Sequence, residues 1–127
     1  MNRAIAEAVR VHGSPDYLIC SAGSSTPGYF LDQTMDIFRN TMELNYIGIV
    51  ASVKATLPYM LRNNQGHLVL VSSAAAISGW IGYSSYCPSK YAVRGLADSL
   101  RSELKGSNID ISIAYRKSSV LMMGMAP

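Results

Sequence analysis

Charged residues are scarce in this chain, at 15% of 127 residues, whereas typical domains contain roughly 25%. Its 11 Lys and Arg residues exceed its 8 Asp and Glu residues only slightly, and no run of like charges occurs. This pattern argues against a basic tract that binds nucleic acid. Because 49% of the residues are hydrophobic, the composition favours one folded domain over a disordered chain.

Cysteine is equally scarce, because only Cys20 and Cys87 are present. Two cysteines exclude a disulfide framework and favour a reducing compartment. Charged side chains interrupt the first ten residues, so the sequence contains no signal peptide pattern there. Residues 68–89 lack charges, but their serines, glycines and proline are unsuited to hydrocarbon. We therefore expect neither secretion nor a membrane span in this chain.

Short apolar runs alternate with longer amphipathic segments, which is typical of repeated βα units. Gly13, Gly66 and Gly106 are expected to end helices. Strands that alternate with helices favour right-handed crossovers and a parallel sheet, so the predicted fold class is α/β. We expect strands at 17–20, 68–71 and 109–115, and helices at 2–11, after Thr34, at about 46–62 and at 90–104.

The carboxyl ends of parallel strands are where ligands gather, and polar side chains follow the expected strands there. Ser73 ends the second strand, and Tyr86 and Lys90 follow, four residues apart. If residues 86–90 open a helix, the phenol and the ammonium project from one face. A phenol is a poor acid at neutral pH, and a nearby cation strengthens it by stabilising the phenolate. With the Ser73 hydroxyl donating to the same oxygen, this group could polarise and protonate a carbonyl.

A Tyr and a Lys at this spacing also occur by chance on many solvated helices, so the pair alone does not indicate catalysis. Its context is more informative. The pair follows a buried strand, a serine at the end of that strand and a loop of small residues. Asn45 stands within an earlier helical segment, where asparagine is an unfavourable residue.

In the order Asn45, Ser73, Tyr86, Lys90, these residues resemble the catalytic tetrad of the short-chain dehydrogenase/reductase family. Residues 17–115 follow the family pattern, which implies a partial Rossmann-like, doubly wound parallel sheet of about three strands with flanking helices. More narrowly, the segment 82–100 is similar to that of 3-ketodihydrosphingosine reductases.

The resemblance implies a role for each residue. Tyr86 would protonate the developing alkoxide, and Ser73 would hydrogen-bond the substrate oxygen. Lys90 would hold the nicotinamide ribose and make Tyr86 more acidic, and Asn45 would anchor a water leading to Lys90. The cofactor loop of the family corresponds to Ser21, Ala22 and Gly23, with Tyr86 and Lys90 also on the cofactor.

The activity implied is NADPH-dependent reduction of a long-chain keto-sphingoid base in sphingolipid synthesis. The family resemblance also implies the cytosolic face of the endoplasmic reticulum, with a general cytoplasmic location as the alternative. It further implies a possible homo-oligomer formed through the helices of Asn45 and Lys90. No metal is expected, because neither His12 nor His67 has a carboxylate or cysteine at ligand spacing.

Two departures from the family pattern leave other functions open. No G-x-G-x-x-G cluster occurs, so residues 1–115 are expected to be a partial domain without the N-terminal dinucleotide half. Residues 116–127 diverge from the family and are expected to be a disordered tail, so the chain reads as truncated at both ends. The alternatives are an inactive fragment that acts only by helix pairing, or a reductase of another hydrophobic ketone or alcohol.

Overall fold

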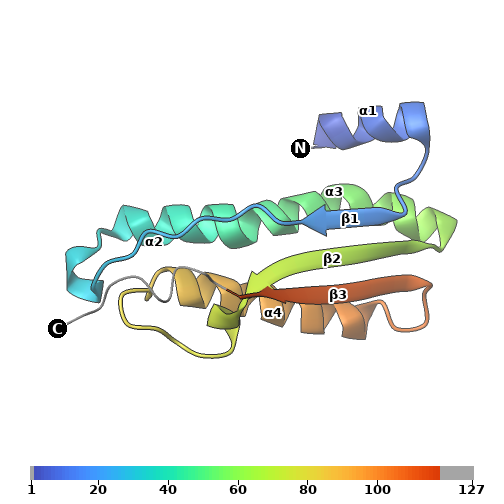
Figure 1. Ribbon diagram of the computed structural model, residues 1–127. Coiled ribbons are helices and arrows are strands. Elements are labelled where there is room, and N and C mark those ends of the chain that lie inside the picture. The colour runs from blue at the N-terminus through green and yellow to red at the C-terminus, as the bar shows by residue number, and fades with distance from the viewer. Residues whose placement is uncertain (1, 118–127) are drawn as a thin grey trace.

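Three strands form one parallel sheet in a computed structural model that describes residues 2–117. They are β1 (Tyr17–Cys20), β2 (Gly66–Ser73) and β3 (Ile109–Arg116), in the spatial order β1-β2-β3 (Figure 1). The last residues of β2 and β3, Ser73 and Arg116, lie opposite each other, whereas β1 ends earlier, with Cys20 opposite Leu70. The prediction of a parallel α/β sheet with flanking helices is confirmed. The tail predicted for residues 116–127 lies outside the described residues from 118 onward.

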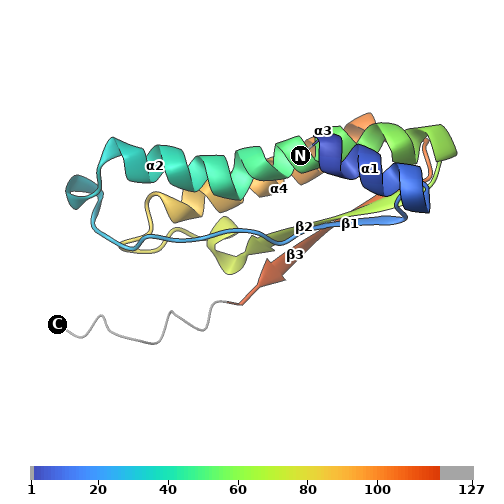
Figure 2. The ribbon, with the colours of Figure 1, turned by 90° about the horizontal axis from the view of Figure 1, so that it is seen from above.

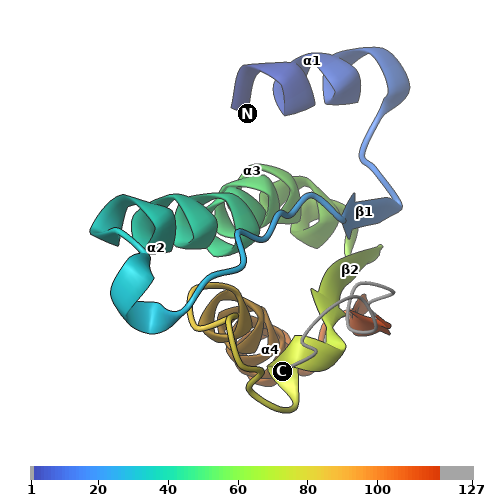
Figure 3. The same ribbon diagram turned by 60° about the vertical axis from the view of Figure 1, so that its left-hand side comes forward.

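Helical crossovers connect the parallel strands. The helix α1 (Asn2–His12) precedes β1, and α2 (Met35–Met42) with α3 (Gly48–Asn63) connects β1 to β2. The helix α4 (Tyr86–Glu103) connects β2 to β3. Helices α3 and α4 pack on one face of the sheet (Figure 2), whereas α1 lies apart from the sheet and contacts α3 (Figure 3). No helix within residues 2–117 combines the length and apolar character needed to cross a membrane.

The core lies between the sheet and the helices α3 and α4. Along β2, fully buried residues alternate with half-buried ones, as expected when one face of a strand is covered. Cys20 contributes to this core, and burial raises the pKa of its thiol. The buried cluster consists of Cys20, Ile49, Val53, Met60, Leu68, Leu70, Val93, Ala97 and Ile109.

The connection between β1 and β2 differs from the sequence expectation in two ways. Helices α2 and α3 are continuous through a π-helical turn, η2 (Glu43–Ile47), where we expected two separate segments. The helix α3 ends at Asn63 and is capped by Asn64, which adopts the left-handed conformation with φ of 47°, so the prediction that Gly66 ends it is wrong. Gly66 instead opens β2, where a Cβ would lie 2.5 Å from Sδ and 2.9 Å from Cβ of the fully buried Met60.

Two glycine-to-alanine substitutions distinguish the steric constraint at Gly66 from the general effect of replacing a glycine by alanine. We expect Gly66→Ala to lower the free energy of unfolding by about 1–3 kcal/mol, because the Met60 side chain must move within a packed core. Gly95→Ala in α4, where a Cβ meets nothing within 4 Å, should raise it by about 0.5–1 kcal/mol through helix propensity. Urea denaturation of both variants measures the two changes. A neutral Gly66→Ala would contradict the packing described here.

Candidate active site

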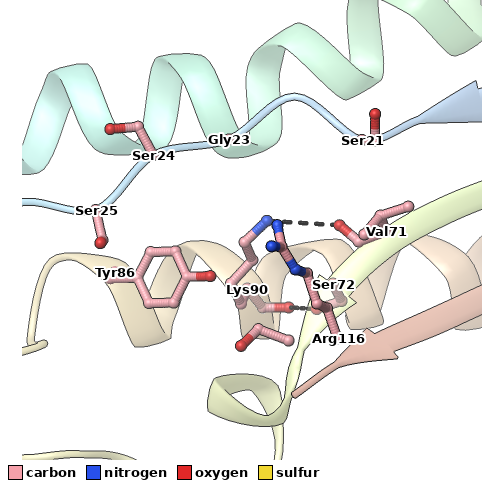
Figure 4. A pocket seen from close by; sticks show the side chains of 10 residues that line it. Ser21, Gly23, Ser24, Ser25, Val71, Ser72, Tyr86, Lys90 and Arg116 are labelled. Atoms are coloured by element: carbon pink, nitrogen blue, oxygen red, sulfur yellow. Dashed lines mark hydrogen bonds between the residues drawn. The ribbon is translucent and has the colours of Figure 1, made fainter. Parts of the chain in front are cut away.

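A pocket of about 210 Å³ opens at the carboxyl ends of the three strands. Five of the predicted site residues line it, and Figure 4 shows four of them: Ser21, Gly23, Tyr86 and Lys90. Ser73 is the fifth, whereas Ala22 does not line the pocket. The complete lining consists of Ser21, Gly23, Ser24, Ser25, Val71, Ser72, Ser73, Tyr86, Lys90 and Arg116.

Tyr86 and Lys90 lie on the first turn and a half of α4 and project into the pocket from one helix face. The Nζ atom of Lys90 lies 5.7 Å from the centroid of the Tyr86 ring. Figure 4 shows the phenol oxygen of Tyr86 directed toward Lys90. Pro88 fits in this turn because the first N–H groups of a helix have no partner within the helix. The geometry therefore places a cation beside the phenol, as general acid chemistry requires.

Lys90 is the most deeply buried charged residue of the pocket, with 4% of its surface exposed. Its Nζ donates to the carbonyl oxygen of Val71 at 3.5 Å, and no ion pair with a carboxylate forms in the described part of the chain. Burial lowers the pKa of Lys90 because desolvation disfavours the ammonium. A buried cation without a carboxylate partner therefore lines the pocket, and its other N–H donors can bind a ligand.

Ser73 is positioned by the end of β2 and by the short helix that follows it. Its Oγ accepts a hydrogen bond of 3.2 Å from the backbone N–H of Ala75, which caps η3 (Ala74–Ala76). Because this bond uses only a lone pair, the hydroxyl proton remains available to a ligand oxygen. The neighbouring Ser72 donates instead to the carbonyl oxygen of Lys90 at 3.1 Å, which fixes α4 against β2.

Asn45 does not line the pocket and is fully buried in the π-helical turn. Its Oδ1 accepts from the Ser24 N–H at 2.8 Å, and its Nδ2 donates to the Ser24 carbonyl at 2.8 Å and to Ser89 Oγ at 3.0 Å. One side chain thereby joins the loop after β1 to the helix that carries Tyr86 and Lys90. The predicted role of Asn45 as the anchor of a water molecule stays a prediction.

The same loop passes close over Lys90 at Gly23. A Cβ at this position would lie 3.1 Å from Lys90 Nζ and 3.2 Å from Asn45 Oδ1. These distances leave little room for a side chain, so the small residue brings the backbone next to the ammonium. The loop and Asn45 together cover the cation from the side of β1.

Arg116 is a pocket residue that the sequence analysis did not identify. The sequence analysis places it in the divergent tail, whereas the structure makes it the last residue of β3, paired in register with Ser73. The alternation of apolar residues from Ile109 to Tyr115 could have indicated its place, because a strand that continues by one more residue ends at Arg116. Figure 4 shows its side chain reaching into the pocket with that of Lys90.

Comparison with known proteins places these features in one family. A family model described as short chain dehydrogenase matches residues 1–116. The chain belongs to this family. The 3-ketodihydrosphingosine reductase of Dictyostelium discoideum is 49% identical over 105 residues, which are 81% of this chain and 31% of that protein. The 3-dehydrosphinganine reductase of Danio rerio is 40% identical over 111 residues, or 87% of this chain and 33% of that protein.

A solved structure also matches the fold. The apo form of LigO from Sphingobium sp. strain SYK-6 superposes with a TM-score of 0.86 at 36% identity, over 90% of this chain and 43% of that one. The chain spans about a third of the length of the curated relatives that it matches. Its resemblance to 3-ketodihydrosphingosine reductases, inferred above from residues 82–100, is confirmed by the identity of these relatives.

The family implies a nicotinamide dinucleotide cofactor, and the residues of the pocket fit this group. The buried ammonium of Lys90 has no carboxylate partner in the described chain, so its donors suit hydroxyl or phosphate oxygens. Gly23 provides the close approach of backbone that a Cβ would obstruct. Within residues 2–117, no group of three or more His, Cys, Asp and Glu side chains is placed to hold a metal ion.

Removing the side-chain amide of Asn45 tests whether this residue holds the loop after β1 in place. We expect Asn45→Ala to lower the free energy of unfolding by about 2–4 kcal/mol, because three hydrogen bonds are lost in a buried setting. Hydrogen exchange should accelerate at the Ser24 amide, which donates to Asn45 Oδ1, while the central amides of β2 remain protected. Unchanged protection at Ser24 would show that the loop is held by other contacts.

Lys90→Met tests the cost of burying the ammonium. The unfolded chain binds a proton at lysine with the ordinary pKa of about 10.4, whereas the folded chain binds it with a lowered pKa. Between these two values the unfolded state holds more protons, so the stability of the wild type rises with pH. We expect Lys90→Met to be at least as stable as the wild type at pH 7 and to lose this advantage as the pH approaches 10. Denaturation series at several pH values measure the difference. A difference that does not change with pH would contradict the lowered pKa.

Proposed function

We propose that this pocket binds NADPH and that the whole protein reduces the carbonyl of a long-chain keto-sphingoid base to the 3-hydroxy product. The observation that carries this proposal is the convergence of Tyr86, Lys90 and Ser73 on one pocket at the carboxyl ends of the sheet. The names of the relatives in Dictyostelium discoideum and Danio rerio support the substrate class. We place the reaction at the cytosolic face of the endoplasmic reticulum, on the family resemblance.

The bound cofactor supplies the hydride that reaches the carbonyl carbon. In this proposal the Ser73 hydroxyl donates to the carbonyl oxygen and orients the substrate. Tyr86 gives its phenolic proton to the same oxygen as negative charge develops there, and the product is the neutral alcohol. The Lys90 ammonium stabilises the phenolate that remains, and its other donors bind ribose hydroxyls of the cofactor.

A second candidate is association through helices, without catalysis. Large apolar side chains are exposed where η2 and α4 face away from the core: Leu44 is 46% exposed, Ile47 is 40% exposed and Tyr91 is 42% exposed. These residues flank Asn45 and Lys90 in sequence, so the helices that build the pocket could also pair with another copy. This reading requires no cofactor binding.

Cofactor binding and chemistry can be separated with one ligand and two tyrosine variants. A ligand that binds only the folded state raises the melting temperature with concentration, so NADPH should stabilise the chain. Tyr86→Phe should keep this thermal shift and lose the reduction of 3-ketodihydrosphingosine by at least about a hundredfold, the smallest factor expected for a general acid. Tyr91→Phe, an exposed tyrosine on the same helix, is the matched control and should keep both.

The outcomes distinguish the two candidates. Absence of a thermal shift at millimolar NADPH would contradict the reductase proposal for this chain. Dimerisation in sedimentation measurements without that shift would favour the second candidate. Retained reduction by Tyr86→Phe would show that another group delivers the proton.

A further inference from the structure

Two cations face the pocket, and one of them takes no part in the chemistry proposed above. Lys90 approaches from α4, and Arg116 approaches from the end of β3 (Figure 4). Arg116 forms no ion pair or side-chain hydrogen bond with the rest of residues 2–117. Its five N–H donors are therefore available to a ligand in the pocket.

No aspartate or glutamate lines this pocket to balance these charges. The remaining lining consists of serines, Gly23, Val71 and the phenol of Tyr86, all of which are uncharged when the phenol is protonated. The local potential at the pocket is therefore positive, although the whole chain has a net charge of only +3.

The backbone register places Arg116 next to the reacting groups. Arg116 is the Cα partner of Ser73 across the β2–β3 ladder, and adjacent strands lie roughly 4.8 Å apart. Ser73 is the residue assigned above to the carbonyl oxygen. A nicotinamide ring that delivers hydride to that carbonyl must lie close to it, and so within the field of Arg116 as well as that of Lys90.

We propose that Arg116, acting with Lys90, makes this pocket distinguish the two redox states of the nicotinamide ring and bind the neutral dihydronicotinamide in preference to the cationic pyridinium. The inference rests on the proposed function, because it takes the pocket as the nicotinamide site. The two forms of the cofactor share almost all their contacts and differ by one positive charge on the ring. A positive pocket therefore weakens the binding of the oxidised form alone.

This preference suits a reductase. The reduced cofactor is loaded preferentially, and the oxidised product dissociates more readily once the hydride has been transferred. Arg116 is a specificity-determining residue in this arrangement, since it selects the cofactor form without exchanging a proton with the substrate.

Binding constants of NADPH and NADP⁺ for the same chain test the inference. Titration calorimetry should give tighter binding of NADPH for the wild type. Because Arg116 is partly screened by solvent, we expect Arg116→Gln to reduce the affinity ratio by about threefold to fivefold. The change should come mainly from tighter binding of NADP⁺.

Two further variants separate charge from shape. Lys117→Gln removes the same charge from the adjacent residue, which does not line the pocket, and should leave the ratio unchanged. Arg116→Lys retains the charge and should keep most of the preference. Raising the salt concentration should reduce the wild-type ratio, because solvent-exposed charges are screened.

Each outcome has one meaning. A reduced ratio in Arg116→Gln, with Lys117→Gln and Arg116→Lys near the wild type, supports the inference. Equal ratios in Arg116→Gln and the wild type overturn it, while leaving the proposed reductase intact because both cofactor forms bind. Failure of the wild type to bind either form overturns the inference together with the function on which it rests.

Discussion

The ammonium of Lys90 is buried without a counter-ion in the described chain, and the arrangement of the pocket depends on this constraint. Burial of a charge is costly, so a folded chain keeps such a group only where surrounding structure fixes it. Here β2 contributes the carbonyl oxygen of Val71, and Gly23 covers the ammonium from the other side. Asn45 holds that covering loop in place through both backbone groups of Ser24.

The burial of Lys90 without a carboxylate partner costs free energy, but it leaves the positive charge available to groups in the pocket. A cation without a carboxylate partner retains its field for a ligand and for the phenol of Tyr86, whereas an ion pair would neutralise it. The same absence of carboxylates makes Arg116 relevant, because its charge adds to that of Lys90 at the end of the sheet. The pocket thus offers hydroxyl donors and positive charge, which suit an oxygen atom that gains negative charge.

The pairing of Tyr86 with Lys90 could be predicted from the sequence because a helix places residues four apart on one face. The position of Ser73 followed from the rule that parallel strands present their carboxyl ends at one edge. The contacts of Asn45 could not be predicted, because the π-helical turn changes which residues face inward and hydropathy does not signal such a turn. Likewise, the end of α3 could not be predicted, because Asn64 takes the left-handed conformation that the sequence analysis expected of a glycine, while Gly66 is needed where β2 passes the side chain of Met60.

Arg116 shows a second reason why part of the site could not be predicted from the sequence. Local pattern indicated a strand as far as Tyr115, but the pairing of Arg116 with Ser73 depends on the register of two strands separated by a whole helix. A residue that diverges from a family pattern is easily assigned to a tail, although the sheet continues through it. The site is therefore shaped by family-like residues on α4 and β2 and by one residue that only the sheet register brings to it.

The most direct test of this account is an NMR titration that follows the Nζ group of Lys90 in the chain without ligand. The account predicts deprotonation at a pH below the ordinary lysine pKa of about 10.4, because burial disfavours the charged form of Lys90. A titration of Lys90 at or above that value would contradict the burial of an unpaired cation, and with it the structure of the pocket described here.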